Sequence, residues 1–411
     1  MITAVFVALA LAVVALASRL SDFFLLAYLF IGLYLANLAW IRLAGPGLRV
    51  RREFQKRSFL GESSTVELVV ENRNWLPVPW LNLNEQIPVE LGHRDALNLA
   101  VALPPRAERR YRYEITGGQR GVYLLGPLEI SYGDVFGIHR REARIREGER
   151  KYVYPRIIPI PDLGLPSTTP MGTERSAVRI YEDPSRVAGV REYTPSDSPR
   201  LINWKASAAR GQLLVRQLQP AVSHEVLIVV DLNPNEYSSG WAPYASELSI
   251  TGAASFANNL IERRQAVGLI VNGLDRNEEI SRPAAQLVMR TRQLRNPSVP
   301  IGRGRRHLMG ILEMLARSAM LPRADFSAQV RNHLARLSFG STIVMFAGGR
   351  TNHLPMLKRM QRQGHKVMVI YSDPEHAAAA QAKASSVAIN AFVATDREDY
   401  ANWGRRLRPA S

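Results

Sequence analysis

The chain has 411 residues, enough for two or three domains. Its formal net charge of +17 predicts attraction to anionic surfaces, either acidic phospholipid or nucleic acid. The sequence contains no cysteine, which excludes disulfides, thiol catalysis and cysteine-ligated metal sites. Hydrophobic residues make up an ordinary 46% of the chain, so any membrane part must be local.

Two apolar runs open the chain, at residues 2–17 and 23–43. A signal peptide is the alternative for the first run, but no basic segment precedes it and the second run follows closely. We therefore predict a transmembrane helical hairpin over residues 1–45. Arg42, Arg49 and Arg51 crowd the C-terminal end of the second run. The positive-inside rule then places both termini and the later domains in the cytoplasm, at a bacterial inner membrane, with anionic lipid as a binding partner.

The next two segments differ in pattern. Residues 46–156 alternate between apolar and polar side chains in short runs separated by glycine and proline, which predicts a small antiparallel β-sandwich. Residues 157–188 are rich in proline, serine, threonine and glycine, which predicts a linker.

Residues 189–220 combine charged, aromatic and turn-forming residues. We predict a turn at residues 194–197, then a helix capped by Asp197 or Ser198 that runs to about residue 209, where Gly211 ends it. Asp197 and Arg200 are close enough in sequence to pair, and Trp204 is expected to bury its ring. The segment is either an inter-domain strap or a partner-binding surface, whose candidate residues are Arg191, Tyr193, Asp197, Arg200, Trp204, Lys205 and Arg210.

Residues 221–411 alternate between strand and helix patterns. The predicted strands include 225–230, 267–271, 342–346, 366–371 and 388–393, and the predicted helices include 247–265, 307–317, 326–337, 354–363 and 400–407. This alternation predicts a doubly wound, parallel-sheet α/β domain.

The run REYTPSDSPRLINWKASAARGQLLVRQ at residues 191–217 resembles the signature of the DUF58 family. Ser196 stands where that family usually has glycine, and Asn203 where it has aspartate or histidine. The resemblance implies that residues 221–411 form a von Willebrand factor A-like domain. It also implies a working partner, because genes of this family commonly lie beside those of MoxR-type AAA+ ATPases.

A von Willebrand factor A domain can hold Mg²⁺ through a D-x-S-x-S loop, a threonine and a later aspartate. In the corresponding loop here only Asp231 matches, while Asn233 and Asn235 replace the two serines. The strand at residues 342–346 continues into Ala347, so the later carboxylate is missing there. We therefore expect no cofactor, and keep Mg²⁺ held by Asp231, Asn233 and Asn235 as the alternative.

No catalytic motif is recognisable in the sequence. It contains no G-x-S-x-G elbow, no phosphate-binding P-loop and no H-E-x-x-H pair, so we expect no enzyme. An arginine-rich stretch at residues 290–306 is the candidate for nucleic-acid binding, but no aromatic residues are interleaved in it for base stacking, so no nucleic-acid partner is expected.

These observations favour a non-catalytic, membrane-anchored protein-interaction module that works with a MoxR-type AAA+ ATPase in the assembly or maturation of other proteins. The alternative is a Mg²⁺-dependent adhesion-type module that binds its ligand through the Asp231 loop. Nucleic-acid binding is a weaker third hypothesis.

Overall fold

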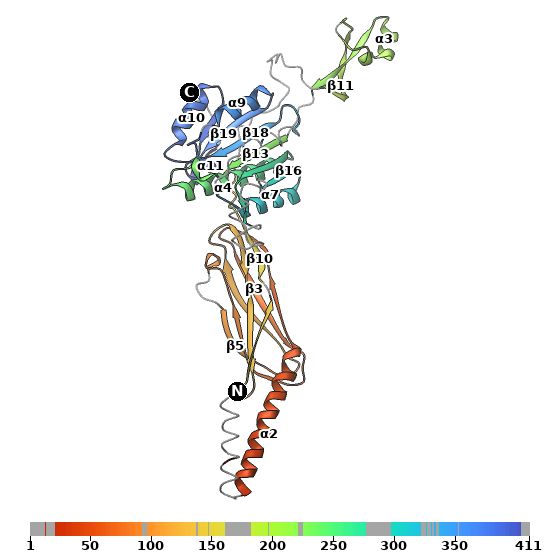
Figure 1. Ribbon diagram of the computed structural model, residues 1–411. Coiled ribbons are helices and arrows are strands. Elements are labelled where there is room, and N and C mark those ends of the chain that lie inside the picture. Colours follow the sequence, from red (N-terminus) through yellow and green to blue (C-terminus); the bar gives the residue numbers. More distant parts are fainter. Residues whose placement is uncertain are drawn as a thin grey trace. The chain divides into compact units, whose positions relative to one another are not determined.

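The computed structural model of the protein describes residues 13, 21–92, 97–136, 139–146, 148–160, 182–195, 197–220, 225–276, 297–321, 326, 330, 333, 337–351 and 353–403. The chain divides into two compact units, Met1–Arg156 and Ile157–Ser411 (Figure 1).

The second apolar run forms helix α2, Ser21–Ala44. A stretch apolar and long enough to cross a membrane, Tyr28–Gly47, takes in most of this helix and the turn that follows it. Near its C-terminus Asn37, Ile41 and Ala44 are buried at helical spacing, so this end packs on the strands that follow. Asn74 caps the helix, because its Nδ2 donates to the carbonyl oxygens of Leu43 (2.9 Å) and Ala44 (2.8 Å). The first apolar run, apart from Val13, lies outside the described residues, and with it one half of the predicted hairpin.

Beyond α2, the described residues of the first unit form ten strands. They are β1 (Leu48–Phe54), β2 (Arg57–Phe59), β3 (Ser63–Asn72), β4 (Val78–Glu85), β5 (Leu97–Leu103), β6 (Glu108–Thr116), β7 (Gly121–Leu125), β8 (Leu128–Gly133), β9 (Arg140–Arg146) and β10 (Glu149–Tyr154). They form sheets in the orders β1-β3-β6, β5-β4-β8-β9 and β2-β10-β7. The pairs are antiparallel except β2 with β10.

Alternation along these strands explains their shared core. Val66, Leu68 and Val70 of β3 point to the same face as Leu81 and Leu83 of β4, and all five are buried in one hydrophobic cluster. The sheet that contains β3 therefore packs face to face with the sheet that contains β4, as the alternating pattern predicts. An ion pair is also buried there: Arg52 pairs with Glu85, which accepts a further hydrogen bond from the Tyr113 hydroxyl (2.7 Å).

In the second unit a six-stranded sheet has the order β16-β14-β13-β18-β19-β20. The strands are β13 (Glu225–Asp231), β14 (Ala266–Asn272), β16 (Ser298–Gly302), β18 (Thr342–Ala347), β19 (Lys366–Tyr371) and β20 (Asn390–Val393). All neighbours are parallel except β14 with β16, which are antiparallel. The sheet is therefore mixed, and the prediction of a fully parallel sheet is wrong at this edge. A short β15 (Leu274–Asp275) pairs separately with β17 (Ser318–Ala319).

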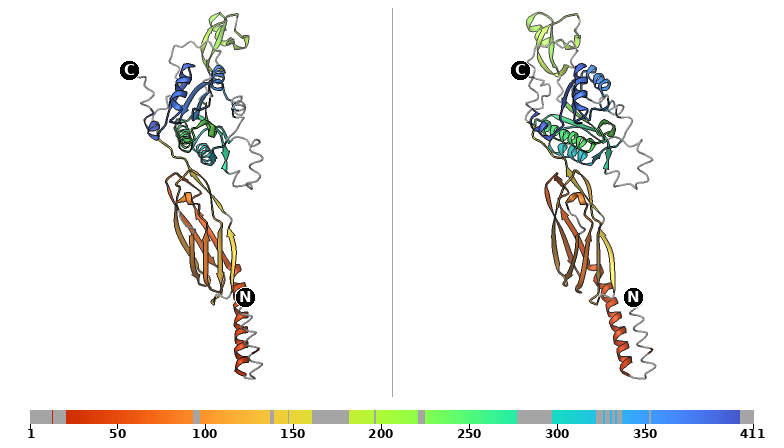
Figure 2. Two further views of the ribbon diagram at one scale, coloured as in Figure 1. Left: turned by 60° about the vertical axis from the view of Figure 1, so that its left-hand side comes forward. Right: turned by 90° about the vertical axis from the view of Figure 1, so that its left-hand side faces the viewer.

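Helices cover both faces of this sheet (Figure 2). On one face α9 (Leu354–Arg362) and α10 (Ala377–Ser386) share a core with Val229 and Met345. On the other, α4 (Ala242–Glu262) brings Phe256 to within 5.4 Å of Phe346, measured between ring centroids, and α7 (Arg305–Arg317) packs beside α4. Helix α11, Arg397–Ala401, begins earlier than the helix predicted at residues 400–407, of which residues 404–407 lie outside the described part of the chain. Most of the helix predicted at residues 326–337 lies outside the described residues.

The segment at residues 189–220 forms a strand pair with a short helix between the strands. Strand β11 (Glu182–Glu192) pairs antiparallel with β12 (Leu214–Pro220), so β11 begins inside the stretch predicted as linker. Pro199 opens a one-turn 3-10 helix, Pro199–Leu201, and not the longer helix that we predicted. Helix α3 (Trp204–Arg210) starts later, capped by the Asn203 side chain, and ends as predicted at Gly211, whose φ is 67°.

Candidate functional site

The centre of the six-stranded sheet brings together two loops that are distant in sequence. From β13 the chain first adds β14 on one side and later β18 on the other, so the strand order reverses between β13 and β18. In open α/β sheets, ligands bind outside the carboxyl ends of the strands at such a switch point. Asp231 ends β13, and the loop after β18 leads to His353 at the start of α9.

Three titratable side chains meet at this point. His353 Nε2 lies 2.9 Å from Glu236 Oε1 and 3.4 Å from Asp231 Oδ2. Ligand atoms from the three residues all lie within 4.8 Å of one another. Asp231 and Glu236 are almost fully buried, 2% and 1% exposed, and His353 is mostly buried. We call Asp231, Glu236 and His353 the switch-point cluster.

Local turn chemistry directs Glu236 inward. Asp231 Oδ1 accepts hydrogen bonds from the Asn233 backbone N–H (2.9 Å) and from Asn272 Nδ2 (2.6 Å). Pro234 then starts a 3-10 turn, Pro234–Glu236, which Asn233 caps by accepting from the Asn235 N–H (3.1 Å). The amide oxygen of Asn233 is therefore engaged with the backbone, and Asn235 is exposed. Of the predicted metal ligands, only Asp231 lies in the switch-point cluster.

Gly348 makes room for this arrangement. A Cβ atom at Gly348 would collide with the backbone carbonyl of Glu236, whose oxygen also accepts from the Arg350 N–H (3.2 Å). The Ala347–Gly348 sequence after β18 lacks a carboxylate, but it allows the loop that carries Glu236 to pack closely. Asp373, fully buried after β19, holds the same loop through the backbone N–H and hydroxyl of Ser238. No spacing signal in the sequence pointed to Glu236 or His353.

The charges of the cluster perturb one another. Burial raises the pKa of Asp231 to about 7, and the neighbouring Glu236 carboxylate adds to the rise. Burial alone would lower the pKa of His353. The hydrogen bond to Glu236 and the charges of Glu236 and Asp231 outweigh it, so the pKa of His353 is raised. The pKa values of Asp231 and His353 thus depend on the other charges of the buried cluster.

The donor set can hold a divalent cation. Glu236 Oε2 and Asn272 Oδ1 are buried, and no protein atom among the described residues donates a hydrogen bond to either. One imidazole nitrogen with two carboxylates suits Mn²⁺ or Zn²⁺, whereas Mg²⁺ prefers oxygen ligands in octahedral geometry. The residues present therefore fit the Mg²⁺ site of a von Willebrand factor A domain poorly.

The predicted partner-binding residues lie on the segment between β11 and β12. Asp197 accepts from Arg191 Nη1 (2.7 Å) and Nη2 (2.6 Å), and also from the backbone N–H (2.9 Å) and hydroxyl (2.8 Å) of Thr194. Asp197 therefore pairs with Arg191, and not with Arg200 as we predicted. The Arg191 guanidinium, followed by the Thr194 donors, holds the pKa of Asp197 well below its usual range.

Trp204 is 68% exposed. The prediction that its ring is buried is therefore wrong. Trp204 is the first residue of α3, and the helix is held by the Ser207 hydroxyl, which donates to the Asn203 carbonyl oxygen (2.9 Å) and accepts from the Leu214 backbone N–H (2.9 Å). Arg200, Lys205 and Arg210 are exposed on the same segment, and Tyr193 is half-buried. The structure thus gathers an exposed indole and several basic side chains on one short braced segment.

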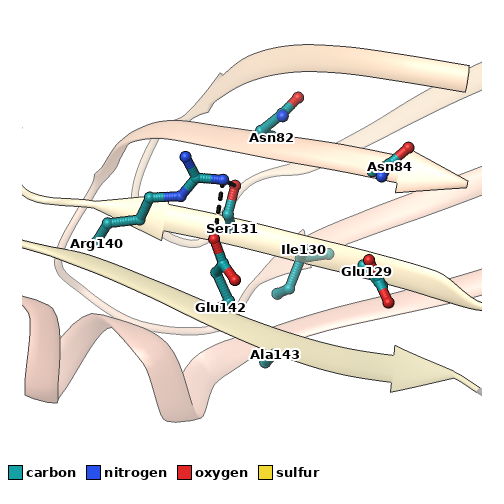
Figure 3. A pocket seen from close by; sticks show the side chains of 8 residues that line it. All are labelled: Asn82, Asn84, Glu129, Ile130, Ser131, Arg140, Glu142 and Ala143. Atoms are coloured by element: carbon teal, nitrogen blue, oxygen red, sulfur yellow. Dashed lines mark hydrogen bonds and ion pairs between the residues drawn. The ribbon is translucent and has the colours of Figure 1, made fainter.

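Two other features offer less chemistry. A hollow of about 260 Å³ on the first unit lies over β4, β8 and β9 (Figure 3), where Arg140 contacts Ser131 and Glu142, each at 3.1 Å. Arg140, the basic side chain among the lining residues, is therefore already paired within the hollow. In the arginine-rich stretch, Arg303, Arg305 and Arg306 are exposed and the residues at 290–295 lie outside the described part of the chain.

The fold and site define a multidomain α/β protein with a buried carboxylate–imidazole cluster at the switch point of its sheet. Residues 189–378 match the family described as "Protein of unknown function DUF58", the family that the signature segment predicts.

Other comparisons give weaker likenesses. An "Uncharacterized protein YeaD" of Bacillus subtilis (strain 168) is 22% identical over 229 residues, which cover 53% of this chain and 54% of that protein. The chain thus matches about half the length of this curated relative. Crystal structures of a Listeria innocua beta-glucosidase cover 26% of this chain, with gluconolactone (14% identity, 16% of that chain) and without it (15% identity, 15% of that chain). Both have a TM-score of 0.16, too low to carry an argument.

Proposed function

We propose that this protein is a non-catalytic, membrane-anchored interaction module that binds an acidic surface of a partner protein through its signature segment, residues 189–220. The observation that carries the proposal is Trp204, exposed on a segment that its own hydrogen bonds hold in shape. Exposed tryptophan and arginine are the residues that most often dominate binding energy at protein interfaces.

Charge identifies the kind of partner. Arg200, Lys205 and Arg210 surround Trp204 in sequence and are exposed, while Asp197, the nearest acid, is already paired with Arg191. The net charge that this segment presents is therefore positive, and a complementary surface is acidic. The family resemblance suggests a MoxR-type AAA+ ATPase as that partner, in the assembly or maturation of other proteins.

Membrane anchoring completes the proposal. Most of helix α2 belongs to an apolar stretch of spanning length, and Arg42, Arg49 and Arg51 lie near the C-terminal end of that stretch. We propose that the anchor lies in a bacterial inner membrane as one half of a helical hairpin, with the folded units in the cytoplasm beside anionic lipid. Because the chain has no cysteine, single-cysteine variants at exposed sites of each unit would report the side of the membrane by labelling with an impermeant maleimide.

The test is a detergent-solubilised affinity purification of the tagged full chain. We compare the wild type with an Arg200→Ala, Lys205→Ala, Arg210→Ala triple variant, whose exposed positions leave folding unchanged. An AAA+ ATPase that co-purifies with the wild type and is lost from the triple variant supports the proposal. A matched triple variant at exposed Arg303, Arg305 and Arg306 must retain it. If all three proteins capture the same partners, the segment is a structural strap.

The switch-point cluster favours a second candidate function, metal-dependent ligand binding. Glu236 carries the argument, since its Oε2 is buried without a hydrogen-bond donor among the described residues while Oε1 faces His353. A divalent cation would be held by Asp231, Glu236 and His353 and would supply a Lewis acid for a ligand's carboxylate. Calorimetry measures the binding of Mn²⁺ or Zn²⁺ to the wild type and to a His353→Ala variant. Binding that the variant loses supports this candidate, and no binding to the wild type shows that the cluster is only a buried ion pair.

A further inference from the structure

The turn between β8 and β9 presents two large apolar side chains to solvent. Val135 is 61% exposed and Phe136 is 60% exposed. The turn itself is firmly held: fully buried Asp134 accepts from the backbone N–H groups of Phe136 (3.0 Å) and His139 (2.9 Å). Trp80 Nε1 donates to the Asp134 carbonyl oxygen (3.1 Å). The outward position of the two apolar side chains is therefore a fixed property of the turn.

This turn lies beside helix α2. The ring of His139 is 4.9 Å from the ring of Tyr34, measured between centroids. Closer to the helix end, Trp40 Nε1 donates to the Pro77 carbonyl oxygen (3.2 Å), and Asn74 caps the helix. Helix and strands of the first unit are thus joined at several points along the helix. Since Tyr34 lies within the apolar stretch Tyr28–Gly47, the turn lies alongside that stretch and not beyond its end.

Helix length then fixes the depth of the turn. Crossing a hydrocarbon layer of about 30 Å takes about 20 helical residues. The part of α2 before Tyr34 starts at Ser21 and is only about 20 Å long, at the helical rise of about 1.5 Å per residue. A bilayer crossed by α2 must therefore extend past Tyr34 toward Trp40, which places the level of the β8–β9 turn inside one leaflet.

The composition of the turn fits that depth. The polar groups of Asp134 are buried and hydrogen-bonded, and the two described side chains exposed at the tip, Val135 and Phe136, are apolar. Arg140 and Arg141 follow directly and are exposed, and long arginine side chains can reach phospholipid headgroups from such a position. Bilayer lipid therefore matches both the apolar tip and its basic flank.

We propose that Val135 and Phe136 insert into the acyl layer of one leaflet, as a second membrane contact that fixes the first unit against the bilayer. The inference rests on the membrane anchoring by α2 proposed above. It adds a defined pair of lipid-contacting residues that lie far from the anchor in sequence.

A single-cysteine label tests the proposal in the full chain, because the wild type has no cysteine. An environment-sensitive fluorophore is attached at Phe136→Cys, and the protein is reconstituted into vesicles of phosphatidylethanolamine and phosphatidylglycerol. The matched control is Val89→Cys, 71% exposed. The control lies near the opposite end of the β4–β8 strand pair from the turn. At the turn end Trp80 pairs with Gly133, and at the other end, close to Val89 in sequence, Glu85 pairs with Leu128.

We expect the label at residue 136 to show blue-shifted emission, to be quenched by doxyl-labelled lipid and to resist aqueous iodide. The label at residue 89 should show the reverse. If the protein floats with the vesicles but both labels respond to iodide alone, the inference is overturned while the anchor stands. A label at residue 136 that resists both quenchers is covered by protein, which also overturns it. Failure of the protein to float at all overturns the anchor together with the inference.

Discussion

His353 Nε2 lies between two buried carboxylates, 2.9 Å from Glu236 and 3.4 Å from Asp231. The three residues come from two loops that the reversal of strand order places side by side. Isolated charges at such depth cost several kcal/mol each, so the imidazole or a bound cation must compensate the carboxylates.

Divalent cations should stabilise the protein through this cluster. We expect Zn²⁺ or Mn²⁺ to raise the melting temperature of the second unit by several degrees at concentrations about 100 times the dissociation constant. Mg²⁺ should have a smaller effect. Differential scanning fluorimetry on the wild type, His353→Ala and the control His376→Ala checks this, since His376 lies outside the cluster. Equal shifts in all three proteins would show that the cation binds elsewhere.

The metal effect should depend on pH. Because the pKa of Asp231 is raised to about 7, its folded-state carboxyl retains a proton that the unfolded chain loses near pH 4. Without metal, stability therefore falls as pH rises through about 7. Because a cation needs the carboxylate and the neutral imidazole, its affinity should rise between about pH 6 and pH 8. Titration calorimetry at these two pH values measures it, and a constant affinity contradicts the prediction.

Gly252 of α4 should not tolerate a side chain. A Cβ atom there would overlap the Tyr400 hydroxyl and the ring of Phe346, both buried. Gly252→Ala should therefore lower the free energy of unfolding by about 1–3 kcal/mol, the usual cost of overpacking. A Cβ atom added at Gly310 of α7 would meet nothing within 4 Å, so Gly310→Ala should stabilise by about 0.5–1 kcal/mol. Chemical denaturation of the wild type and both variants measures these free energies of unfolding. Equal changes in the two variants would contradict the prediction.

The turn at Asp197 should persist in acid. Its pKa is lowered, chiefly by the hydrogen bond from Arg191. The ionised Asp197 carboxylate therefore stabilises the folded state fully above the unfolded-state pKa of about 3.9. This stabilisation is lost only as the pH falls through the lower folded-state pKa. Arg191→Gln should bring that pKa back toward its usual range. Carboxyl NMR titration of the two proteins measures the difference, and identical titration curves would show that the ion pair does not form in solution.

Sequence periodicity predicted most strands and helices of the second unit because apolar spacing determines which face is buried. It did not predict β16, the edge strand that runs antiparallel to β14, because its five residues are at most partly buried and carry no continuous apolar run. Pro199 and the preceding polar residues resembled a helix start, but they form a single 3-10 turn before Asn203 caps α3. A local cap signal cannot specify how many turns follow.

The switch-point cluster was only partly predictable. Asp231 follows a strand and is visible in sequence, whereas Glu236 and His353 meet it only through tertiary packing that Gly348 permits. Trp204 was expected inside because large aromatic side chains usually bury apolar area. Its exposure depends on the direction in which α3 leaves Asn203, which the sequence does not encode locally.

The most direct test of the proposed function measures binding of a purified MoxR-type AAA+ ATPase to the purified full chain in detergent. Trp204→Ala removes the exposed indole of the signature segment, and Trp75→Ala makes the same change at an indole 71% exposed in the other unit. We expect the wild type and Trp75→Ala to bind equally, and Trp204→Ala to bind at least about tenfold more weakly, as for an interface hot spot. Equal affinity for all three proteins would contradict the claim that this segment is the partner-binding surface.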